Sequence, residues 1–251
     1  MKKLTWLDDA EWGRIEGLLP RGRRGAHRVD DRRVISGIVH MLRSGARWRD
    51  CPAEYGPYTT IYNRFNRWSR QGIWSGMFEA LTGSTGIHGA VAIDSSTVKA
   101  HRSAAGGKGG YRQAIGRSRG GRTTKIHALT DAAGKPRLLL ITPGNLHDVM
   151  AAPELLSAVG PIARLIADKA YDTNKLRYLL AEHRIEAVIP SIARRKPLIP
   201  YDRVAYRQRN LIERMFCRLK DFRRVATRYD KLARNFLAGV MLAAALTWWL
   251  N

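Results

Sequence analysis

Apolar side chains recur at helical spacing over the first third of the chain. Residues 5–19 carry one apolar stripe, which predicts a helix. Asp30 or Asp31 can cap a second helix that runs to residue 43 with its apolar side chains on one face. A third helix is expected from residue 59 or 60 to residue 71. The first third of the chain is therefore predicted to be all-α.

The pattern changes after residue 89, where apolar residues come in short runs that later alternate with helical stretches. This alternation is typical of an α/β domain. The expected strands cover residues 90–94, 125–131, 137–142, 164–168 and 187–190, and the expected helices cover residues 149–159 and 173–183.

We predict two domains joined by a short linker: residues 1–82 form a helical domain, residues 83–89 the linker and residues 90–251 the α/β domain. Residues 103–121, rich in Gly and Arg, are expected to form a long, mobile basic loop that orders on its ligand. The apolar run 236–250 is shorter than the roughly 20 residues that span a bilayer. We interpret this run as a buried core helix, with a membrane anchor as the alternative.

The charge of the chain points to a polyanionic partner. It carries 44 Lys and Arg against 21 Asp and Glu, a formal net charge of +23. Residues 95–130 hold eight Lys or Arg and no acid, and residues 194–234 hold fourteen against four acids. Arginine suits phosphate because its guanidinium is a bidentate donor. DNA is the expected partner, and an evenly solvated basic surface is the plainer alternative.

Two features concern the surroundings of the protein and its N-terminal domain. Cys51 and Cys217 have no Cys or His nearby at zinc-ligand spacing, and the sequence shows no secretory signal, so we expect a reduced, cytoplasmic compartment and no membrane partner. Arg64 and Arg67 are expected on the surface of the third helix, where a small helical domain resembles a helix-turn-helix DNA reader. A helical bundle with solvated arginines is the alternative.

Two carboxylates end apolar runs that predict buried strands. Asp94 follows residues 91–93, and Asp168 follows residues 165–167. An unpaired buried carboxylate is costly, so two of them at the ends of core strands indicate a shared cation. For either residue alone, a strand-ending turn or a helix cap is the more common explanation.

A third carboxylate, Glu213, lies on a predicted helix. Each helical residue turns by about 100°, so one arc of about 60° holds four polar residues. These residues are Tyr206, Arg209, Glu213 and Lys220. The opposite side carries Leu211, Ile212, Met215, Leu219 and Phe222, and a third, basic stripe carries Arg207, Arg214 and Arg218. The acid is therefore surrounded by cations, and a surface ion pair with Arg209 is the alternative.

The spacing of those four polar residues resembles the Tyr-Arg-Glu-Lys signature of bacterial insertion-sequence transposases of the IS-four and IS-five groups. Residues 93–96, with Lys99 and His101, resemble the first-Asp strand of that family, and residues 167–172 resemble its second-Asp block. Residues 45–58, with Trp48, are similar to the DNA-binding region of the IS-five group. Together the motifs cover most of the chain in the right order.

The resemblance implies a DDE transposase of α/β class. Its catalytic domain would be ribonuclease H-like, a mixed sheet flanked by helices, behind an N-terminal all-α, helix-turn-helix-like DNA-binding domain. Asp94, Asp168 and Glu213 would converge there as catalytic metal ligands, while Asp172 is expected to cap the next helix. The short interval between Asp168 and Glu213 implies a compact version without the large inserted domain of some relatives.

Hard oxygen ligands favour two Mg²⁺ ions, with Mn²⁺ as a substitute. Water is expected to attack first at the transposon end, and the freed 3′ hydroxyl then attacks target DNA. The expected partners are double-stranded DNA, as terminal inverted repeats and as target, and further copies of the chain in a homodimer or larger assembly on the bacterial nucleoid. The expected DNA contacts are Tyr206, Arg209, Lys220, Arg207, Arg214, Lys99, Arg122, Lys125, Arg64 and Arg67. His101 and His127 are interpreted as structural rather than accessory to catalysis.

Two other functions stay open on the sequence alone. A structure-specific nuclease would use the same carboxylates without strand transfer. A DNA-binding repressor that has lost catalysis would keep the basic surface, although the intact acids count against it.

Overall fold

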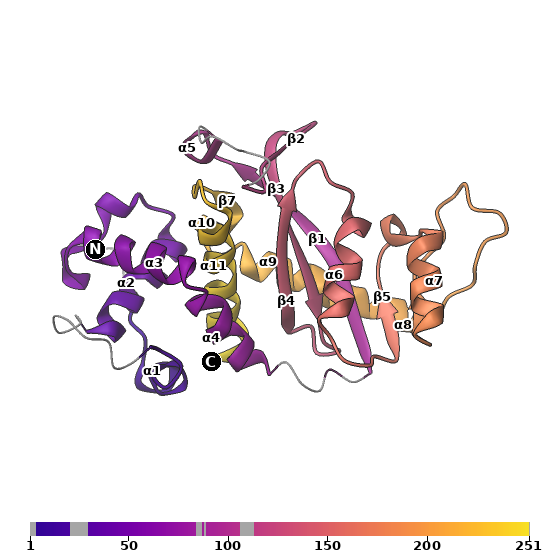
Figure 1. Cartoon of the computed structure of the whole chain (residues 1–251), viewed down its shortest axis with the longest axis horizontal. Coiled ribbons are helices and arrows are strands. Elements are labelled where there is room, and N and C mark those ends of the chain that lie inside the picture. The colour runs from indigo at the N-terminus through magenta and orange to yellow at the C-terminus, as the bar shows by residue number, and fades with distance from the viewer. Residues whose placement is uncertain (1–3, 21–29, 84–86, 88, 106–112, 251) are drawn as a thin grey trace. The chain divides into compact units, whose positions relative to one another are not determined.

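The chain folds into two compact units in the computed structural model, which describes residues 4–20, 30–83, 87, 89–105 and 113–250 (Figure 1). The first unit comprises Met1–Thr82, Ala100–Lys108 and Arg218–Asn251, and the second comprises Gly83–Lys99 and Gly109–Cys217. The division expected from the sequence placed the segment Arg218–Asn251 in the α/β domain. The contacts instead group it with the N-terminal helices, because the apolar C-terminal helix packs on three of them.

The first unit is built almost entirely from helices. They are α1 (Asp9–Glu16), α2 (Asp31–Ser44), α3 (Tyr58–Arg70), α4 (Ile73–Thr82), α5 (Arg102–Ala105), α10 (Arg223–Ala226) and α11 (Ala233–Ala244), with the short helices η1 (Trp48–Asp50), η2 (Ala53–Tyr55) and η6 (Ala245–Trp249) and the two-residue strand β7 (Thr227–Arg228). The carboxylate of Asp30 accepts the Arg33 N–H at 3.3 Å and caps α2, as predicted. Helix α1 starts later than expected because Asp8 and Glu11 form a capping box at its first turn.

Helix α11 forms the centre of this unit and contacts α2, α3 and α4. Residues from Val240 through Leu246, in α11 and the start of η6, are buried, which confirms the expected core helix. A methyl group added at Gly239 would lie 3.2 Å from the Leu42 side chain, so the glycine permits α2 to approach α11 closely. Within the described residues, every helix is too short or too polar to cross a membrane.

The expectation that Arg64 lies on the surface of α3 is wrong. Its side chain is only 5% exposed, pairs with Asp31 at the start of α2 and lies 4.9 Å from the ring centre of Trp68. At helical spacing, Arg64 shares the buried face of α3 with Ile61 and Trp68, so its charge serves the packing of two helices. Arg67, on the other side, is exposed as predicted.

The second unit contains the mixed sheet expected from the sequence. Strand β3 (Gly121–Thr130) pairs antiparallel with β1 (Ala90–Ala100) on one side and with β4 (Pro136–Pro143) and β2 (Gly116–Ser118) on the other. Strands β5 (Arg164–Ile166) and β6 (Glu186–Val188) continue the sheet parallel to β1. The sheet thus runs β4-β3-β1-β5-β6.

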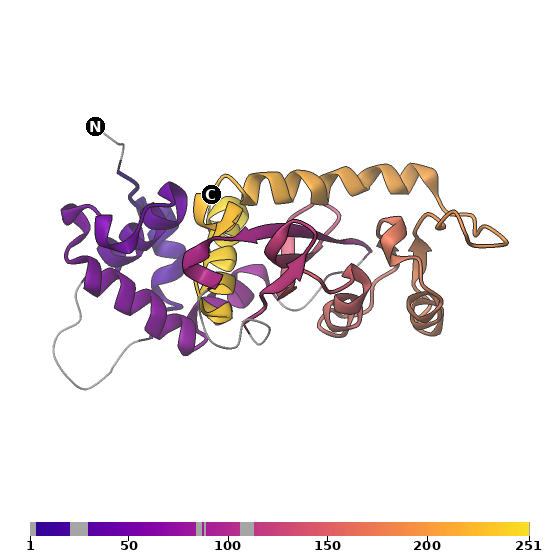
Figure 2. The same ribbon diagram turned by 90° about the horizontal axis from the view of Figure 1, so that it is seen from above.

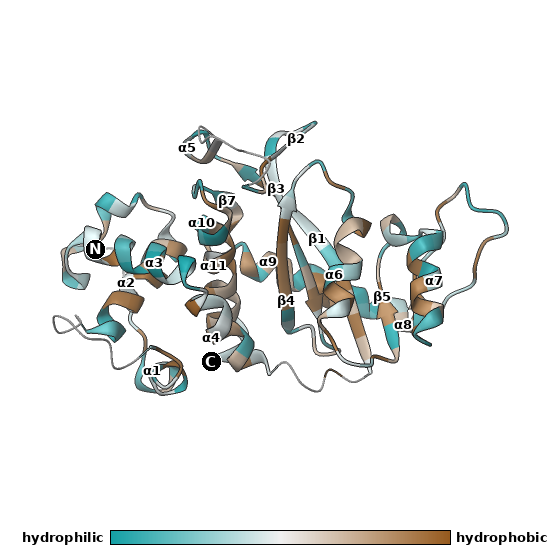
Figure 3. Cartoon of the chain, in the orientation of Figure 1, coloured by the Kyte–Doolittle hydropathy of each residue, from teal (hydrophilic) through white to brown (hydrophobic). Residues whose placement is uncertain are grey.

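Helices cover both faces of this sheet (Figure 2). One face bears η3 (Asp148–Ala151), α6 (Ala152–Ser157), η4 (Lys169–Tyr171) and α7 (Asn174–Glu182), and the other bears α8 (Arg203–Tyr206), η5 (Arg207–Arg209) and α9 (Asn210–Leu219). The core on the first face includes Val91, Ile93, Leu155, Leu165 and Leu180. Figure 3 shows the matching pattern, with an apolar strand β4 and alternating polar and apolar bands on α7.

Two sequence expectations about this part of the chain need correction. The strand predicted over residues 90–94 continues to Ala100, because the mostly polar residues 95–99 pair through their backbones with β3. The basic loop predicted over residues 103–121 contains a strand, since Gly116–Ser118 pairs along the end of β3. Residues 106–112 of that loop lie outside the described residues.

Asp172 does not cap the following helix as expected, because the Thr173 hydroxyl takes that place by accepting the Leu176 N–H. The Asp172 carboxylate is buried and accepts Nε–H groups of Arg177 at 2.6 Å and Arg195 at 2.7 Å. Burial alone would raise the pKa of Asp172, but the hydrogen bonds from Arg195 and Arg177 hold that pKa below its usual range. Asp172 therefore ties the loop after β6 to α7.

We expect Asp172→Ala to lower the free energy of unfolding by about 3 kcal/mol, because two guanidinium groups lose their buried partner. The depressed pKa gives the sign of the pH effect: the stabilisation is complete above the unfolded-state pKa of about 3.9 and is lost as the pH falls through the lower folded-state pKa. Urea unfolding of both proteins between neutral and acidic pH measures this difference. Asp50→Asn, which removes an exposed ion pair with Arg47, serves as the control and should change little. Equal losses in the two variants would contradict the assignment.

Candidate active site

Asp94 and Asp168 are brought together by the register of two parallel strands. Strands β1 and β5 pair through Ala92 and Ile166, and each aspartate lies two residues beyond its member of that pair. Side chains two residues apart on a strand point to the same face, and neighbouring strands lie about 4.8 Å apart. The chain leaves β5 just before Asp168, whose carboxylate accepts the Ala170 N–H at 2.8 Å and begins η4.

Glu213 joins this site through Arg209. The Arg209 Nη1 donates to the Asp94 carboxylate at 2.8 Å, and its Nη2 donates to the Glu213 carboxylate one turn along the helix. The guanidinium thus bridges a strand residue and a helix residue 119 positions apart in the sequence. The apolar side predicted for this helix is confirmed where Ile212, Met215 and Leu219 are buried.

The two bridged carboxylates differ in their exposure to solvent. The Asp94 side chain is 17% exposed, whereas that of Glu213 is 53% exposed. Burial raises the pKa of Asp94 to about 6; the Ser95 N–H and the charge of Arg209 act against this rise, and the charge of Asp168 adds to it. A carboxylate that is this costly to ionise needs a cation nearby, and Arg209 supplies one.

A fourth carboxylate, Asp148, lies beside the site and was not among the predicted residues. Its Oδ1 accepts the Ser95 hydroxyl at 2.6 Å and lies 2.7 Å from the Lys125 Nζ, while the Ser95 N–H donates to Asp94 at 2.7 Å. Lys125 was expected to contact DNA, but it is engaged by Asp148 and by the Leu146 carbonyl. The sequence signal for Asp148 is its place at the start of a short helix that follows a strand, since Asp148 begins η3 after β4 and Asp168 precedes η4 after β5.

Tyr171 adds a buried hydroxyl to the site. Its ring is fully buried, and its hydroxyl has no hydrogen-bond partner among the described residues. Burial, reinforced by the charges of Asp94, Asp148 and Asp168, raises the pKa of this phenol far above its usual value. It is therefore a neutral donor close to three aspartates.

The other residues predicted to contact DNA differ in their exposure to solvent. Arg207, Arg214, Lys99 and Arg122 are exposed, as DNA contacts require. Tyr206 is half-buried, packs edge-on against Tyr201 and has the Arg209 guanidinium 5.9 Å from its ring centre. Lys220 follows the last residue of α9 and belongs to the first compact unit.

The two histidines named from the sequence, His101 and His127, differ in burial. His127 is buried in β3, and its Nε2 lies 2.7 Å from the Thr142 hydroxyl. Burial lowers the pKa of His127 to about 4, so its ring is neutral at pH 7 and has a structural role, as expected. His101 is exposed and belongs to the first unit, where its ring lies 5.0 Å from that of Tyr229.

The donor set suits a hard divalent cation. Carboxylate oxygens are the ligands that magnesium prefers. The guanidinium of Arg209 already places a positive charge between the carboxylates of Asp94 and Glu213. Within the part of the chain that the structure describes, no three acidic, His or Cys side chains are arranged to hold a metal ion as they stand. Arg209 pairs with both Asp94 and Glu213 in this arrangement.

Known proteins match both parts of the chain. Residues 7–78 match a family described as a putative transposase of the IS4/5 family, and residues 85–248 match the transposase DDE domain. A putative transposase for insertion sequence element IS6501 from Brucella ovis is 38% identical over 127 residues, which cover 50% of this chain and 98% of that protein. A putative transposase for IS402 from Burkholderia cepacia is 31% identical over 50% of this chain and 63% of its own length.

The fold also matches a solved structure, a piggyBac transposase in a synaptic complex with hairpin DNA. The TM-score is 0.54 at 13% sequence identity, covering 97% of this chain and 72% of that chain. This likeness confirms the ribonuclease H-like fold expected from the sequence. Since the DDE-domain match spans most of the chain and is supported by the relatives, the chain belongs to the DDE-domain transposases of the IS4/5 family.

Proposed function

We propose that this transposase binds the terminal inverted repeats of its insertion sequence and that Asp94, Asp168 and Glu213 are its catalytic metal ligands. The proposed reaction is cleavage at the transposon end followed by transfer of the 3′ end into target DNA, in the bacterial cytoplasm. Two observations support this proposal: Asp94 and Asp168 follow paired positions of neighbouring parallel strands, and Arg209 bridges Asp94 and Glu213.

The three carboxylates would hold two Mg²⁺ ions, or Mn²⁺ in their place. When bound, the ions would activate the attacking oxygen and stabilise the leaving oxygen of the phosphodiester. Asp94 and Asp168 are positioned by the sheet, which gives them a fixed separation, whereas Glu213 is more exposed and lies on a helix. Asp94 and Asp168 would fix the position of the metal site, and Glu213 would supply its third carboxylate ligand.

Arg209 is proposed to have two partners in succession. In the absence of other cations it neutralises Asp94 and Glu213. With cations bound to those carboxylates, the guanidinium N–H groups of Arg209 would instead donate to phosphate oxygens of DNA, to which a guanidinium is well suited. Tyr206 and Lys220 are proposed to hold the DNA near the same phosphate, and the exposed Arg207, Arg214, Lys99, Arg122 and Arg67 to contact the backbone more widely.

Two copies of the chain, or more, are proposed to act together, because both ends of the element must be joined to target DNA. The proposed DNA contacts are mainly electrostatic. The logarithm of the binding constant should therefore fall by about 0.9 per neutralised phosphate for each tenfold rise in salt concentration.

We expect Asp94→Asn, Asp168→Asn and Glu213→Gln each to reduce strand cleavage at least about a hundredfold, because each removes one charged ligand. Binding to an inverted-repeat duplex should stay close to that of the wild-type protein, since the variants add no negative charge. Glu186→Gln, which changes an exposed glutamate paired with Arg164, is the matched control and should cleave normally.

The same assay separates the possible reactions when a pre-cut end and a supercoiled plasmid are supplied with Mg²⁺. Joined products support a transposase, nicked plasmid alone indicates a nuclease, and a shifted end with intact plasmid indicates a binding protein. Normal cleavage by any one of the three carboxylate variants would overturn the role of that residue.

A separate prediction concerns Arg209 as the resident positive charge. Arg209→Gln leaves Asp94 and Glu213 without their partner, so a divalent cation should stabilise this variant more than the wild-type protein. We expect Mg²⁺ to raise the melting temperature of the variant by at least about 2 °C more than that of the wild-type protein. Arg207→Gln, two residues away and exposed, is the control. An equal rise in all three proteins would contradict the prediction.

A further inference from the structure

Strand β1 extends beyond its neighbour β5 at the start of the proposed metal site. The last pair between the two strands joins Ala92 to Ile166, whereas β1 itself continues to Ala100. At Asp94 the strand still pairs with β3 but no longer with β5. Fewer strand hydrogen bonds therefore fix the backbone at this aspartate, and the side chains that hold it have more effect on its orientation.

Ser95, the next residue of β1, connects two carboxylates. Its N–H donates to the Asp94 Oδ1 at 2.7 Å, and its hydroxyl donates to the Asp148 Oδ1 at 2.6 Å. Successive side chains of a strand point to opposite faces of the sheet, so Asp148 holds Ser95 from the face opposite to Asp94. The bond to Asp148 thereby fixes the residue whose N–H orients the Asp94 carboxylate.

Asp148 is itself held in place by Lys125. The Lys125 Nζ lies 2.7 Å from the Asp148 Oδ1 and donates to the Leu146 carbonyl at 2.7 Å. Lys125 is two residues from His127, which pairs with Ser95 across β3 and β1, so these side chains share one face of the sheet. The Asp148 and Lys125 side chains are 26% and 16% exposed, so water only partly screens the ion pair. Asp148 therefore joins β1 to β3 through side chains.

The segment that carries Asp148 also contacts the other end of the site. Asp148 is the first residue of η3, and η3 contacts η4. Helix η4 begins directly after Asp168, whose carboxylate accepts the Ala170 N–H at 2.8 Å. One short helix thus supports both the segment that carries Asp94 and the segment that carries Asp168.

Asp148 accepts its hydrogen bonds as a charged group. Burial would raise its pKa, but the hydrogen bonds from Lys125 and Ser95 hold the pKa of Asp148 below its usual range. Its negative charge also adds to the burial that raises the pKa of Asp94, so the two carboxylates interact electrostatically. A charged acceptor forms a stronger hydrogen bond than a neutral one, and Asp148 therefore restrains Ser95 firmly.

We propose that Asp148, acting through Ser95, is a positioning residue for Asp94. The inference rests on the proposed function, because it concerns the orientation of a proposed metal ligand. Asp148 would not touch the cation. It would hold Ser95 so that the Ser95 N–H occupies the Oδ1 of Asp94 and leaves the Oδ2, which accepts from Arg209 at 2.8 Å, to face the cation. Groups that hydrogen-bond to metal ligands orient them, and their removal usually weakens metal binding by about ten- to a hundredfold.

The test measures Mn²⁺ binding to the full chain without DNA, from the electron paramagnetic resonance signal of free Mn²⁺. Ser95→Ala removes the hydroxyl and leaves the charge of the protein unchanged. We expect this variant to bind Mn²⁺ about tenfold more weakly than the wild-type protein. Ser95→Thr keeps a hydroxyl and suits a strand, so its affinity should stay close to that of the wild-type protein.

A second comparison shows whether the hydroxyl acts through Asp148. Asp148→Ala removes a charge as well as an acceptor, so the informative quantity is the effect of Ser95→Ala in the Asp148→Ala background. We expect little further loss of Mn²⁺ affinity there, because the bond between the two side chains is already absent.

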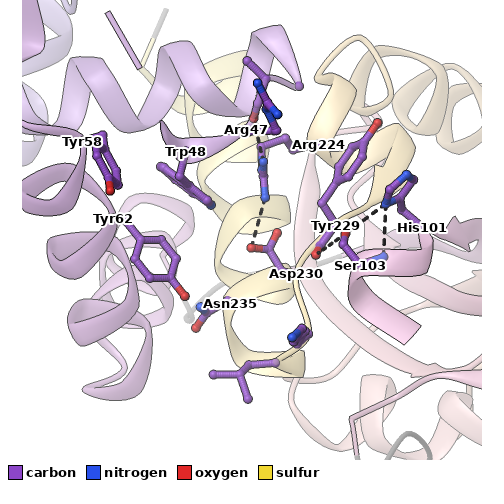
Figure 4. A pocket seen from close by; sticks show the side chains of 14 residues that line it. Arg47, Trp48, Tyr58, Tyr62, His101, Ser103, Arg224, Tyr229, Asp230 and Asn235 are labelled. Carbon is purple, nitrogen blue, oxygen red and sulfur yellow. Dashed lines mark hydrogen bonds and ion pairs between the residues drawn. The ribbon is translucent and has the colours of Figure 1, made fainter. Parts of the chain in front are cut away.

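Asp230→Ala controls for a general loosening of the fold. Asp230 is a buried aspartate of the first unit, where it pairs with Arg224 at 3.4 Å and lines a hollow of that unit (Figure 4). Its removal should lower the stability measured by urea unfolding and leave Mn²⁺ affinity unchanged. Weaker Mn²⁺ binding in Ser95→Ala would then reflect the orientation of Asp94 and not a loss of stability.

Circular dichroism establishes that each variant is folded. Three results would each overturn the inference: wild-type Mn²⁺ affinity in Ser95→Ala, an equally weak Ser95→Thr, or an undiminished effect of Ser95→Ala in the Asp148→Ala background. Any of them can occur while Asp94→Asn abolishes Mn²⁺ binding, in which case the proposed metal site stands. Mn²⁺ binding that does not depend on Asp94 would overturn the proposed metal site and this inference with it.

Discussion

The interaction on which the proposed site depends is the double ion pair of Arg209 with Asp94 and Glu213. Carboxylates placed close together repel one another, and Asp94 also loses hydration by its burial. A positive charge nearby offsets this cost. Arg209 supplies that charge from within the chain, and the same physical requirement supports the proposal that divalent cations bind at this site.

The secondary structure around the site could be predicted because it depends on local patterns. The cap at Asp30, the apolar run before Asp94 and the buried side of the helix that carries Glu213 are all visible in short stretches of sequence. The convergence of the three acids was expected from resemblance to a family rather than from spacing. The register of β1 and β5 places Asp94 and Asp168 on neighbouring strands, and Arg209 contacts both Asp94 and Glu213.

Other features could not be predicted because they depend on contacts between distant residues. Arg64 and Asp172 are charged residues with ordinary sequence neighbours, yet each is buried against partners supplied by other elements. Residues 95–99, in which Val98 is the one apolar side chain, extend β1 because β3 provides backbone hydrogen bonds, and such bonds leave no run of apolar residues in the sequence. The C-terminal helix packs with the N-terminal helices for a similar reason, since an apolar helix reveals that it is buried but not against which partner.

The account of the catalytic centre is tested most directly by an anomalous difference map from crystals of the protein soaked in Mn²⁺. The account predicts a peak within coordination distance of Asp94 and Asp168, with Arg209 moved away from the Asp94 carboxylate. Saturating Mn²⁺ that leaves the Arg209 ion pairs intact, with no peak beside the two aspartates, would contradict it.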